Sequence, residues 1–294
     1  MTAAKHAVYI TENIMEKTDM AGILNLVATP IGNLGDMSPR ALETLESADF
    51  IAAEDTRVTL KLLNHFGIKK QMVSYYEHNN TDSGEKILAR ILAGENCALV
   101  TDAGMPVISD PGEELVRMCA EVGVEIRIVP GPCSAVSALA LSALPTGRFT
   151  FEGFLSVTKK SRYEHLEQLK GEMRTMVFLE APHKLCATLD DMVTYFGADR
   201  RISLSRELTK IHEETLRMTL GEAVEYFKLT PPRGEFVLCV EGKAPEEAPE
   251  MSLDDAVKIV LSYRESGLSL KDAAKKAAEE TGFSKKVLYD ACVK

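Results

Sequence analysis

Five short polar clusters each follow an apolar run of the kind that forms a β-strand. They are EDTR at 54–57, YEHNN at 76–80, TDAG at 101–104, EAPHK at 180–184 and SRELTK at 205–210. Carboxylates in such positions can accept a proton or hold a magnesium ion, and arginines can bind a phosphate group. No D-x-D ligand pair accompanies them, so no metal site is predicted, and magnesium-dependent phosphoryl transfer is kept as an alternative.

The chain lacks the signatures of several large enzyme classes. It contains no G-x-x-x-x-G-K-[ST], no G-x-S-x-G and no H-E-x-x-H, and the segment TPIGNLGD at 29–36 is not a G-x-G-x-x-G fingerprint. These absences argue against P-loop NTPases, α/β-hydrolases and zinc peptidases. The six cysteines include no C-x-x-C pair, which favours reduced thiols in a cytoplasmic protein over zinc ligands.

The segment LVTDAGMPVISDPGEEL (99–115) carries two aspartates with different expected roles. Asp110 is followed by Pro111 and then Glu113, a spacing that predicts Asp110 as the N-cap of a helix. Asp102 caps no predicted helix and lies in a turn of small residues at a strand end, where a ligand can approach the backbone. We therefore expect Asp102 to contribute to a ligand site, with a plain turn role as its alternative.

Strand-like runs alternate with helical patterns in the first half of the chain, which predicts βαβ units and a parallel sheet. The expected strands are 23–29, 49–55, 71–76, 97–102 and 124–131. A helix of small residues follows within 130–144, with Ser134 as its expected N-cap, and should be buried against another element or a flat ligand. Because ligands bind at the carboxyl ends of parallel strands, the polar clusters should meet there.

Beyond residue 145 the strand-like runs lie closer together, which predicts a mixed or antiparallel second sheet. The expected strands are 149–154, 175–181, 201–208, 214–220 and 234–242. Helices are expected only around 159–170 and 183–196.

The length of 294 residues accommodates two domains and an appendage. The expected parts are an N-terminal extension at 1–22, α/β domains at 23–132 and 133–243, a linker at 244–252 and a helical module at 253–294. The extension has no apolar stretch typical of a secretory signal, and no apolar run of 18 residues predicts a membrane span.

The helical module has the spacing of a helix-turn-helix. Three helical patterns follow Ser252, Ser269 and Ser284, and the turn TGFS separates the last two. Residues 253–294 hold eight Lys or Arg and seven Asp or Glu. The preceding residues hold 26 Lys or Arg and 37 Asp or Glu. This local positive balance favours contact with nucleic acid, and a packing appendage of three helices is the alternative.

Seven segments occur in an order and spacing that resemble the tetrapyrrole-methylase-like methyltransferases. They are VATPIGNLGDMSPRA, AAEDTR, TDAGMPVISDPG, PGPCSAVSALALS, FLEAPHK, SRELTK and GEFVLCVEG, between about residues 23 and 242. The resemblance implies two α/β domains with the active site in the cleft between them, S-adenosyl-L-methionine as methyl donor, and a homodimer.

Within that family the chain is most similar to members that modify ribosomal RNA. This similarity implies 2′-O-methylation of a cytidine ribose in the decoding region of 16S ribosomal RNA, on the 30S subunit. A methylase of a small tetrapyrrole precursor and a ligand-sensing, nucleic-acid-binding regulator are the alternatives. The basic-faced tail argues against the first, and the polar strand-end clusters argue against the second.

The resemblance and the strand-end positions together define the expected site residues. Implied cofactor-binding residues are Pro30, Asp102, Ala103, Gly104, Val107, Ile108, Ser134, Ala135, Phe178 and Leu179. Catalytic candidates are Glu54, Asp55, Arg57, Arg206 and Glu207. Glu54 or Asp55 would accept or orient the proton, Arg57 would bind phosphate, and an internal ion pair is the alternative for each. Expected RNA contacts are Lys159, Lys160, Lys285 and Lys286.

Overall fold

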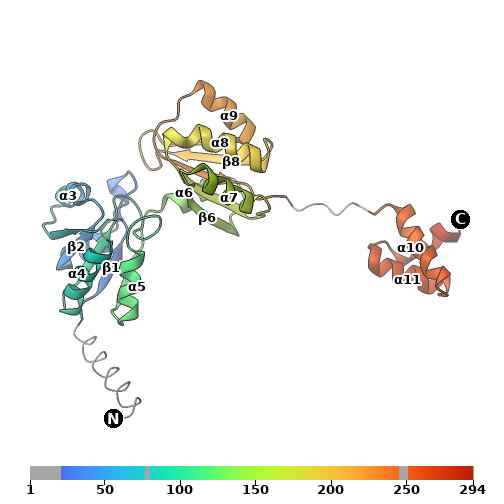
Figure 1. Ribbon diagram of the computed structural model, residues 1–294, viewed down its shortest axis with the longest axis horizontal. Helices are drawn as coiled ribbons and strands as arrows, with labels where there is room; N and C mark the ends of the chain where they lie inside the picture. Colours follow the sequence, from blue (N-terminus) through green and yellow to red (C-terminus); the bar gives the residue numbers. More distant parts are fainter. Residues whose placement is uncertain (1–20, 77–79, 245–250, 294) are drawn as a thin grey trace, which may run out of the picture. The chain divides into compact units, whose positions relative to one another are not determined.

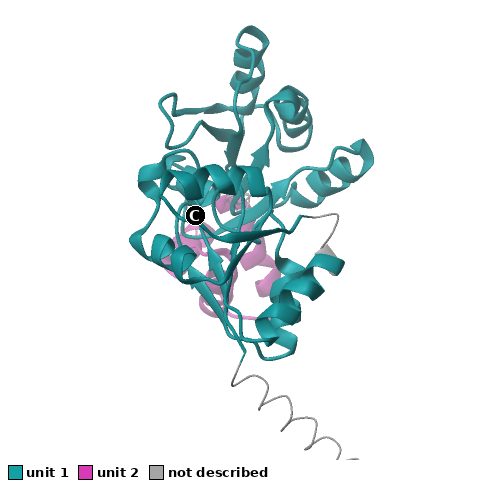
Figure 2. Ribbon diagram, turned by 90° about the vertical axis from the view of Figure 1, so that its left-hand side faces the viewer, with its two compact units in different colours: residues 1–243 teal, residues 244–294 magenta. Residues whose placement is uncertain are grey.

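The computed structural model describes residues 21–76, 80–244 and 251–293. The chain divides into two compact units, residues 1–243 and 244–294, shown in different colours in Figure 2. The first unit contains two five-stranded sheets and the second contains three helices. Most of the expected extension and linker lies outside the described residues.

The first sheet is parallel throughout, with the strand order β3-β2-β4-β1-β5. Its strands are β1 (Leu24–Val27), β2 (Phe50–Ala53), β3 (Gln71–Ser74), β4 (Cys97–Val100) and β5 (Ile126–Val129). Strands β2 and β4 are buried along their whole length, as expected of a parallel sheet covered on both faces.

Helices cover both faces of this sheet, as the ribbon in Figure 1 shows. One apolar core includes residues of α2 (Pro39–Ser47) and α3 (Thr56–His65), and the other includes residues of α4 (Asn80–Leu92) and α5 (Glu113–Glu121). A short 3-10 helix, η1 (Leu34–Asp36), follows β1. The parallel α/β arrangement predicted from the alternating pattern is confirmed.

The prediction that Asp110 caps the helix after β4 is wrong. Helix α5 begins at Glu113, its N-cap is Gly112, and no side chain caps it. Gly112 has φ 145°, a conformation that favours glycine, so the chain turns sharply between Pro111 and the helix. This leaves Asp110 in the loop, free of the capping role.

The second sheet is mixed and has the order β6-β7-β10-β8-β9, with β6 and β7 parallel and the remaining pairs antiparallel. Its strands are β6 (Phe149–Phe154), β7 (Thr175–Glu180), β8 (Arg201–Arg206), β9 (Glu214–Thr219) and β10 (Phe236–Val240). The predicted mixed sheet is therefore confirmed.

Helices α7 (Lys159–Leu169), α8 (Pro182–Phe196) and α9 (Leu220–Leu229) pack on one face of the second sheet, and α6 (Ser134–Leu141) packs on the other. The N-cap of α6 is Cys133, so Ser134 is its first residue and not its cap as expected. Helix α9 is absent from the sequence expectation, although its capping box of Thr219 and Glu222 is present in the sequence.

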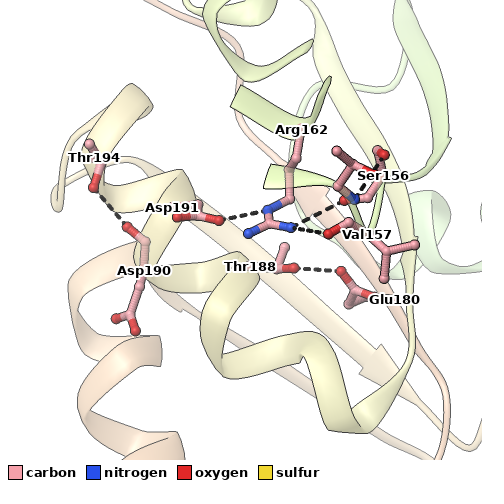
Figure 3. A network of polar contacts seen from close by, with 9 residues as sticks. Ser156, Val157, Arg162, Glu180, Thr188, Asp190, Asp191 and Thr194 are labelled. Carbon is pink, nitrogen blue, oxygen red and sulfur yellow. Dashed lines mark hydrogen bonds and ion pairs between the residues drawn. The ribbon is translucent and has the colours of Figure 1, made fainter. Parts of the chain in front are cut away.

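An ion pair fixes the loop that follows β6. Arg162 of α7 donates to Asp191 of α8 at 2.7 Å and also to the carbonyl oxygens of Ser156 and Val157 (Figure 3). The side chains of the pair are only 13% and 15% exposed. Because the guanidinium joins two helices and a loop, it holds the end of β6, and with it Phe154, in place.

The second unit consists of α10 (Leu253–Glu265), α11 (Leu270–Thr281) and α12 (Lys285–Val293). Its small core consists of Ala256, Val260, Ala273, Ala274, Ala277 and Leu288. Ser252 and Ser269 cap their helices by accepting the backbone N–H of Asp255 and Asp272, as predicted. No helix in the described part of the chain is long and apolar enough to cross a membrane.

Candidate active-site cleft

A cleft of about 330 Å³ lies at the carboxyl ends of the first sheet and is closed by residues of the second. Its acidic lining residues are Glu54, Asp102, Asp110, Glu180, Glu207 and Glu235. Its apolar lining residues include Ile31, Ile108, Phe154, Leu179, Phe236 and Val237. A mostly concave site with apolar walls and a few polar groups suits a small organic ligand, and the many carboxylates favour a cationic one.

Two neighbouring strand ends bring Glu54 and Asp102 together. Glu54 directly follows β2, Asp102 lies two residues beyond β4, and these strands pair in parallel. The Thr101 hydroxyl donates to Glu54 Oε2 at 2.5 Å, and the backbone N–H of Asp102 donates to the same oxygen at 3.3 Å. Asp102 in turn accepts the backbone N–H of Asp55 at 3.2 Å. These bonds connect the two strand ends directly.

Asp55 serves the local structure of α3. It caps the helix by accepting the backbone N–H of Arg57 at 2.8 Å, and its other oxygen accepts Arg57 Nη2 at 2.6 Å. The hydrogen bonds from Arg57 lower the pKa of Asp55 to about 2. The Arg57 side chain is 87% exposed. Asp55 is therefore a weak base, and Arg57 stands at the surface where a phosphate could reach it.

Burial and neighbouring carboxylates raise the pKa values of Asp102 and Asp110. For each the largest cause is loss of solvent, and the second is the charge of Glu54. The pKa of Asp110 rises to about 6, with further contributions from Asp102 and Glu235, while a hydrogen bond with Thr101 opposes the rise. A carboxyl group with this pKa is partly protonated at about pH 6 and ionised at about pH 8.

The second sheet contributes two further carboxylates with protein partners. Glu180 is 2% exposed and accepts the backbone N–H of Ala181 at 2.9 Å and the Thr188 hydroxyl at 2.5 Å (Figure 3). Glu207, whose φ is 52°, pairs with Lys210 Nζ at 3.0 Å. Both side chains are therefore held by the fold.

The structure brings seven of the residues predicted from sequence into this cleft. They are Glu54, Asp102, Ala103, Ile108, Ser134, Leu179 and Glu207. Ser134 lies in the first turn of α6, where backbone N–H groups are unpaired.

Other predicted cofactor residues lie outside the lining. Gly104 forms two backbone hydrogen bonds with Thr29, of 2.9 and 3.1 Å, and Pro30 lines a separate hollow of about 240 Å³. Val107 lines a hollow on the other side of Asp110.

Ala135 and Phe178 are buried in the cores of the second sheet. Successive strand residues face opposite sides, so Leu179 faces the cleft while Phe178 faces away.

The remaining charged candidates lie at the surface or in ion pairs. Arg206 pairs with Glu214 at 2.6 Å and lines hollows beside the cleft. Lys159 and Lys160 occupy the first turn of α7 and are exposed. Lys285 and Lys286 begin α12, in the second compact unit.

The sequence did not identify several lining residues as part of the site. These are Phe154, Asp110, Lys210, Glu235, Phe236 and Val237. Val237 could have been found, because it pairs in register with Leu179 and therefore shares its face. No cluster of three or more His, Cys, Asp or Glu suited to a metal ion occurs among the residues that the structure describes.

The fold and the cleft define the class of protein. The family of Tetrapyrrole (Corrin/Porphyrin) Methylases matches residues 24–224, and the RsmI C-terminal HTH domain matches residues 252–293. The methyltransferase CobJ has a similar fold, with a TM-score of 0.57 at 18% identity, over 76% of this chain and 95% of that one. Uroporphyrin-III C-methyl transferase from Thermus thermophilus, solved with S-adenyl homocysteine, has a TM-score of 0.53 at 20% identity, over 74% of this chain and 97% of that one.

Relatives of higher identity narrow the class. Ribosomal RNA small subunit methyltransferase I of Synechocystis sp. is 48% identical over 268 residues, which cover 91% of this chain and 96% of that protein. The protein of the same name from Bacillus subtilis is 45% identical, over 94% of this chain and 95% of that protein. The chain therefore belongs to the tetrapyrrole methylase family and, within it, to the ribosomal RNA small subunit methyltransferase I family. This membership bears out S-adenosylmethionine as the cofactor.

The cleft fits that cofactor. The molecule carries a positively charged sulfonium, and the six acidic lining residues supply compensating charge. Ile108 and Leu179 supply apolar lining of the kind that suits a flat purine, and Ser134 lies in the first turn of α6, where unpaired backbone N–H groups suit a carboxylate.

Proposed function

We propose that the protein transfers a methyl group from S-adenosylmethionine to the 2′-hydroxyl of a cytidine in the decoding region of 16S ribosomal RNA. The observation that carries this proposal is the presence, on one chain, of an acidic methylase cleft and a helix-turn-helix unit of the ribosomal RNA methyltransferase type. The 30S subunit is the proposed substrate particle, in the cytoplasm. The names of the relatives support ribosomal RNA as the target.

The cofactor supplies an electrophilic methyl group on a sulfonium. On the protein side, Asp102 offers a carboxylate at the end of β4, held by the backbone N–H of Asp55, and so presents a fixed polar group to the ligand. Ile108 and Leu179 line the cleft and place apolar side chains beside the ligand. Such fixed positions favour the in-line geometry that displacement at a methyl carbon requires.

The RNA is proposed to contact basic side chains outside the cleft. Arg57 lies at the N-terminus of α3, three residues after Glu54, and its side chain is 87% exposed. An arginine in that position can bind a phosphate while the ribose lies near the carboxylates. Lys285 and Lys286 begin the last helix of the helix-turn-helix unit, where a docking helix would meet the RNA backbone.

A homodimer is proposed as the working form. Strand β6 is an edge strand of the second sheet, and it exposes Phe149, Phe151 and Phe154 at 41%, 38% and 54%. Val136 of α6 is also 54% exposed. Large apolar side chains gathered on an edge strand are typical of a protein interface. Light scattering should therefore give twice the chain mass of 32.3 kDa.

The experiment is methyl transfer from labelled S-adenosylmethionine to 30S subunits that lack this modification. The proposal predicts label in 16S ribosomal RNA, confined to the decoding region. Purified 50S subunits and a tetrapyrrole precursor serve as competing substrates. Label in the tetrapyrrole and none in the RNA would replace this proposal by the small-molecule methylase.

A further inference from the structure

The loop between β4 and α5 follows a strained backbone path. Val107 and Ser109 have φ values of 79° and 62°, in the left-handed region that β-branched residues in particular avoid. A Cβ on Gly112 would lie 2.7 Å from Cγ2 of Val107, so the turn closes tightly on itself. Strain of this kind persists only where the surrounding structure imposes it. Its result here is that Asp110 is turned into the cleft.

Most of the other carboxylates near this point already bind protein groups. Asp55 is held by Arg57, which makes it a weak base. Four acidic residues of the cleft have the hydrogen bonds or ion pairs given above: Glu54, Asp102, Glu180 and Glu207. Of the two others, Glu235 is exposed, whereas Asp110 is half-buried beside the end of β4, where it has its hydrogen bond with Thr101.

Thr101 connects Asp110 to Glu54. Its hydroxyl donates to Glu54 Oε2 at 2.5 Å and also lies within hydrogen-bonding reach of the Asp110 carboxyl group. A hydroxyl has one proton to donate but can accept as well. When Asp110 is ionised, the Thr101 proton can turn toward it. When Asp110 is protonated, it can donate to Thr101 while Thr101 donates to Glu54. The threonine thus stabilises both protonation states of Asp110.

We propose that Asp110 is the proton acceptor of the methyl transfer, with Thr101 and Glu54 as the groups that position it. This inference rests on the proposed function, because it assumes a ribose hydroxyl as the nucleophile. The hydroxyl oxygen forms a bond to the methyl carbon, and the carbon–sulfur bond breaks with its electron pair remaining on sulfur. The hydroxyl proton passes to the Asp110 carboxylate, which becomes a neutral carboxylic acid. A sulfonium, a hydroxyl and a carboxylate thereby yield an ether, a thioether and a carboxylic acid.

The charges around Asp110 determine the pH dependence. Glu54 faces it from the end of β2, Asp102 from the end of β4 and Glu235 from the start of β10, and all three disfavour its ionisation. Three further groups line the same cleft: Glu180, Glu207 and its ion-pair partner Lys210. The adjoining hollow that Asp110 also lines contains Tyr76, Glu113, Glu114 and Arg117. Asp110 accepts a proton only when ionised, so kcat/KM, which reports groups of the free enzyme, should rise as the pH passes through about 6 and then level off.

The test combines kinetics with a titration that needs no activity. Asp110→Asn and Asp110→Glu are compared with Glu121→Gln, a matched control on the exposed side of α5, where Glu121 pairs with Arg117. The kcat and kcat/KM for 30S methylation are measured from pH 5 to 8, and cofactor affinity is measured by calorimetry. Carboxyl carbon resonances of ligand-free protein labelled at aspartate are titrated by NMR, and the Asp110 signal is assigned by its loss in Asp110→Asn.

The proposal predicts that Asp110→Asn lowers kcat by about 100-fold or more and removes the rise near pH 6, while cofactor binding persists. Asp110→Glu should recover part of the rate, and Glu121→Gln should match the wild type. The assigned NMR signal should titrate near 6. A wild-type rate and pH profile in Asp110→Asn, or titration of the signal near 4, would overturn the proposal. Failure of the wild type to methylate 30S subunits would instead overturn the proposed function, and the NMR titration would still report on Asp110.

Discussion

The part of the chain that contains the cleft is strongly acidic, whereas the C-terminal helical segment has a slight excess of positive charge. Residues 1–252 hold 26 Lys or Arg against 37 Asp or Glu, and residues 253–294 hold eight against seven. A cationic cofactor is attracted to the first unit, but an RNA is repelled by it at long range. Under the proposed function, cofactor binding and RNA docking place opposite demands on charge, and separate segments of the chain would meet them.

The two units also differ in how they are stabilised. The body has several large cores with aromatic residues and a mostly buried ion pair between Arg162 and Asp191. The C-terminal unit has one small core, four of whose six buried residues are alanine. Alanine side chains let helices approach one another closely, so this small core needs few large side chains. We therefore expect the two units to respond independently to core and cleft mutations.

The largest expected effect is that of Arg162→Ala on the body. It leaves Asp191, 15% exposed, without its partner and frees the carbonyl oxygens of Ser156 and Val157. Breaking a buried ion pair in this way should lower the free energy of unfolding by about 3 kcal/mol. Denaturant unfolding should show this loss in the transition of the body, with that of the C-terminal unit unchanged. Arg117→Ala, which breaks an exposed pair, is the control and should cost less than about 1 kcal/mol.

Asp102→Ala should weaken cofactor binding and leave RNA affinity intact. The cleft loses a carboxylate, and the backbone N–H of Asp55 loses its acceptor. A loss of about 1–3 kcal/mol in binding free energy is expected for a charged hydrogen-bonding group. Calorimetry with S-adenosylmethionine measures the change, and filter binding of 30S subunits provides the comparison. Equal cofactor affinity in the variant and the wild type would remove Asp102 from the site.

Truncation after Lys243 should weaken binding of 30S subunits and leave cofactor binding intact. The remaining body is a compact unit with its own cores, so we expect it to fold and to bind the cofactor normally. Without the basic side chains of the C-terminal helices, the apparent KM for 30S subunits should rise about tenfold at physiological salt and less at low salt. Steady-state kinetics at two salt concentrations checks this. An unchanged KM at physiological salt would show that the C-terminal unit is only a packing appendage.

The smallest effect is expected for Lys285→Ala combined with Lys286→Ala in the full chain. Each lysine lost from a phosphate contact should reduce the slope of log K against log salt by about one. Affinity for 30S subunits should then fall by a few fold at physiological salt. Lys228→Ala on α9, where the lysine pairs with Glu225, is the matched control and should leave the slope unchanged.

Sequence patterns predicted the sheets better than the loops. Period-2 runs and βαβ alternation gave the parallel and the mixed sheet, and the hydroxyl caps Ser252 and Ser269 gave two of the C-terminal helix starts. Helix α9 was missed because the strand before it runs directly into the helix at Thr219, with no loop between them. The spacing of apolar residues changes there from that of a strand to that of a helix, and no turn residue marks the boundary.

The location of the cleft was predicted from the sequence, but several of its lining residues were not. Strand ends of a parallel sheet meet by topology, so Glu54 and Asp102 could be expected together. The position of Asp110 could not, because it depends on left-handed backbone at Val107 and Ser109, residue types that give no such signal. Tertiary contacts impose that path, and a capping pattern read from the sequence alone pointed to the wrong role.

The identity of the methylated nucleoside tests the central claim most directly. After reaction of 30S subunits with labelled S-adenosylmethionine, 16S ribosomal RNA is digested to nucleosides, and the labelled product is identified by mass spectrometry. The account predicts 2′-O-methylcytidine as the labelled nucleoside, with its formation by the wild type rising through about pH 6. Label on a nucleobase, or no label in the RNA under conditions where the cofactor is bound, would contradict it.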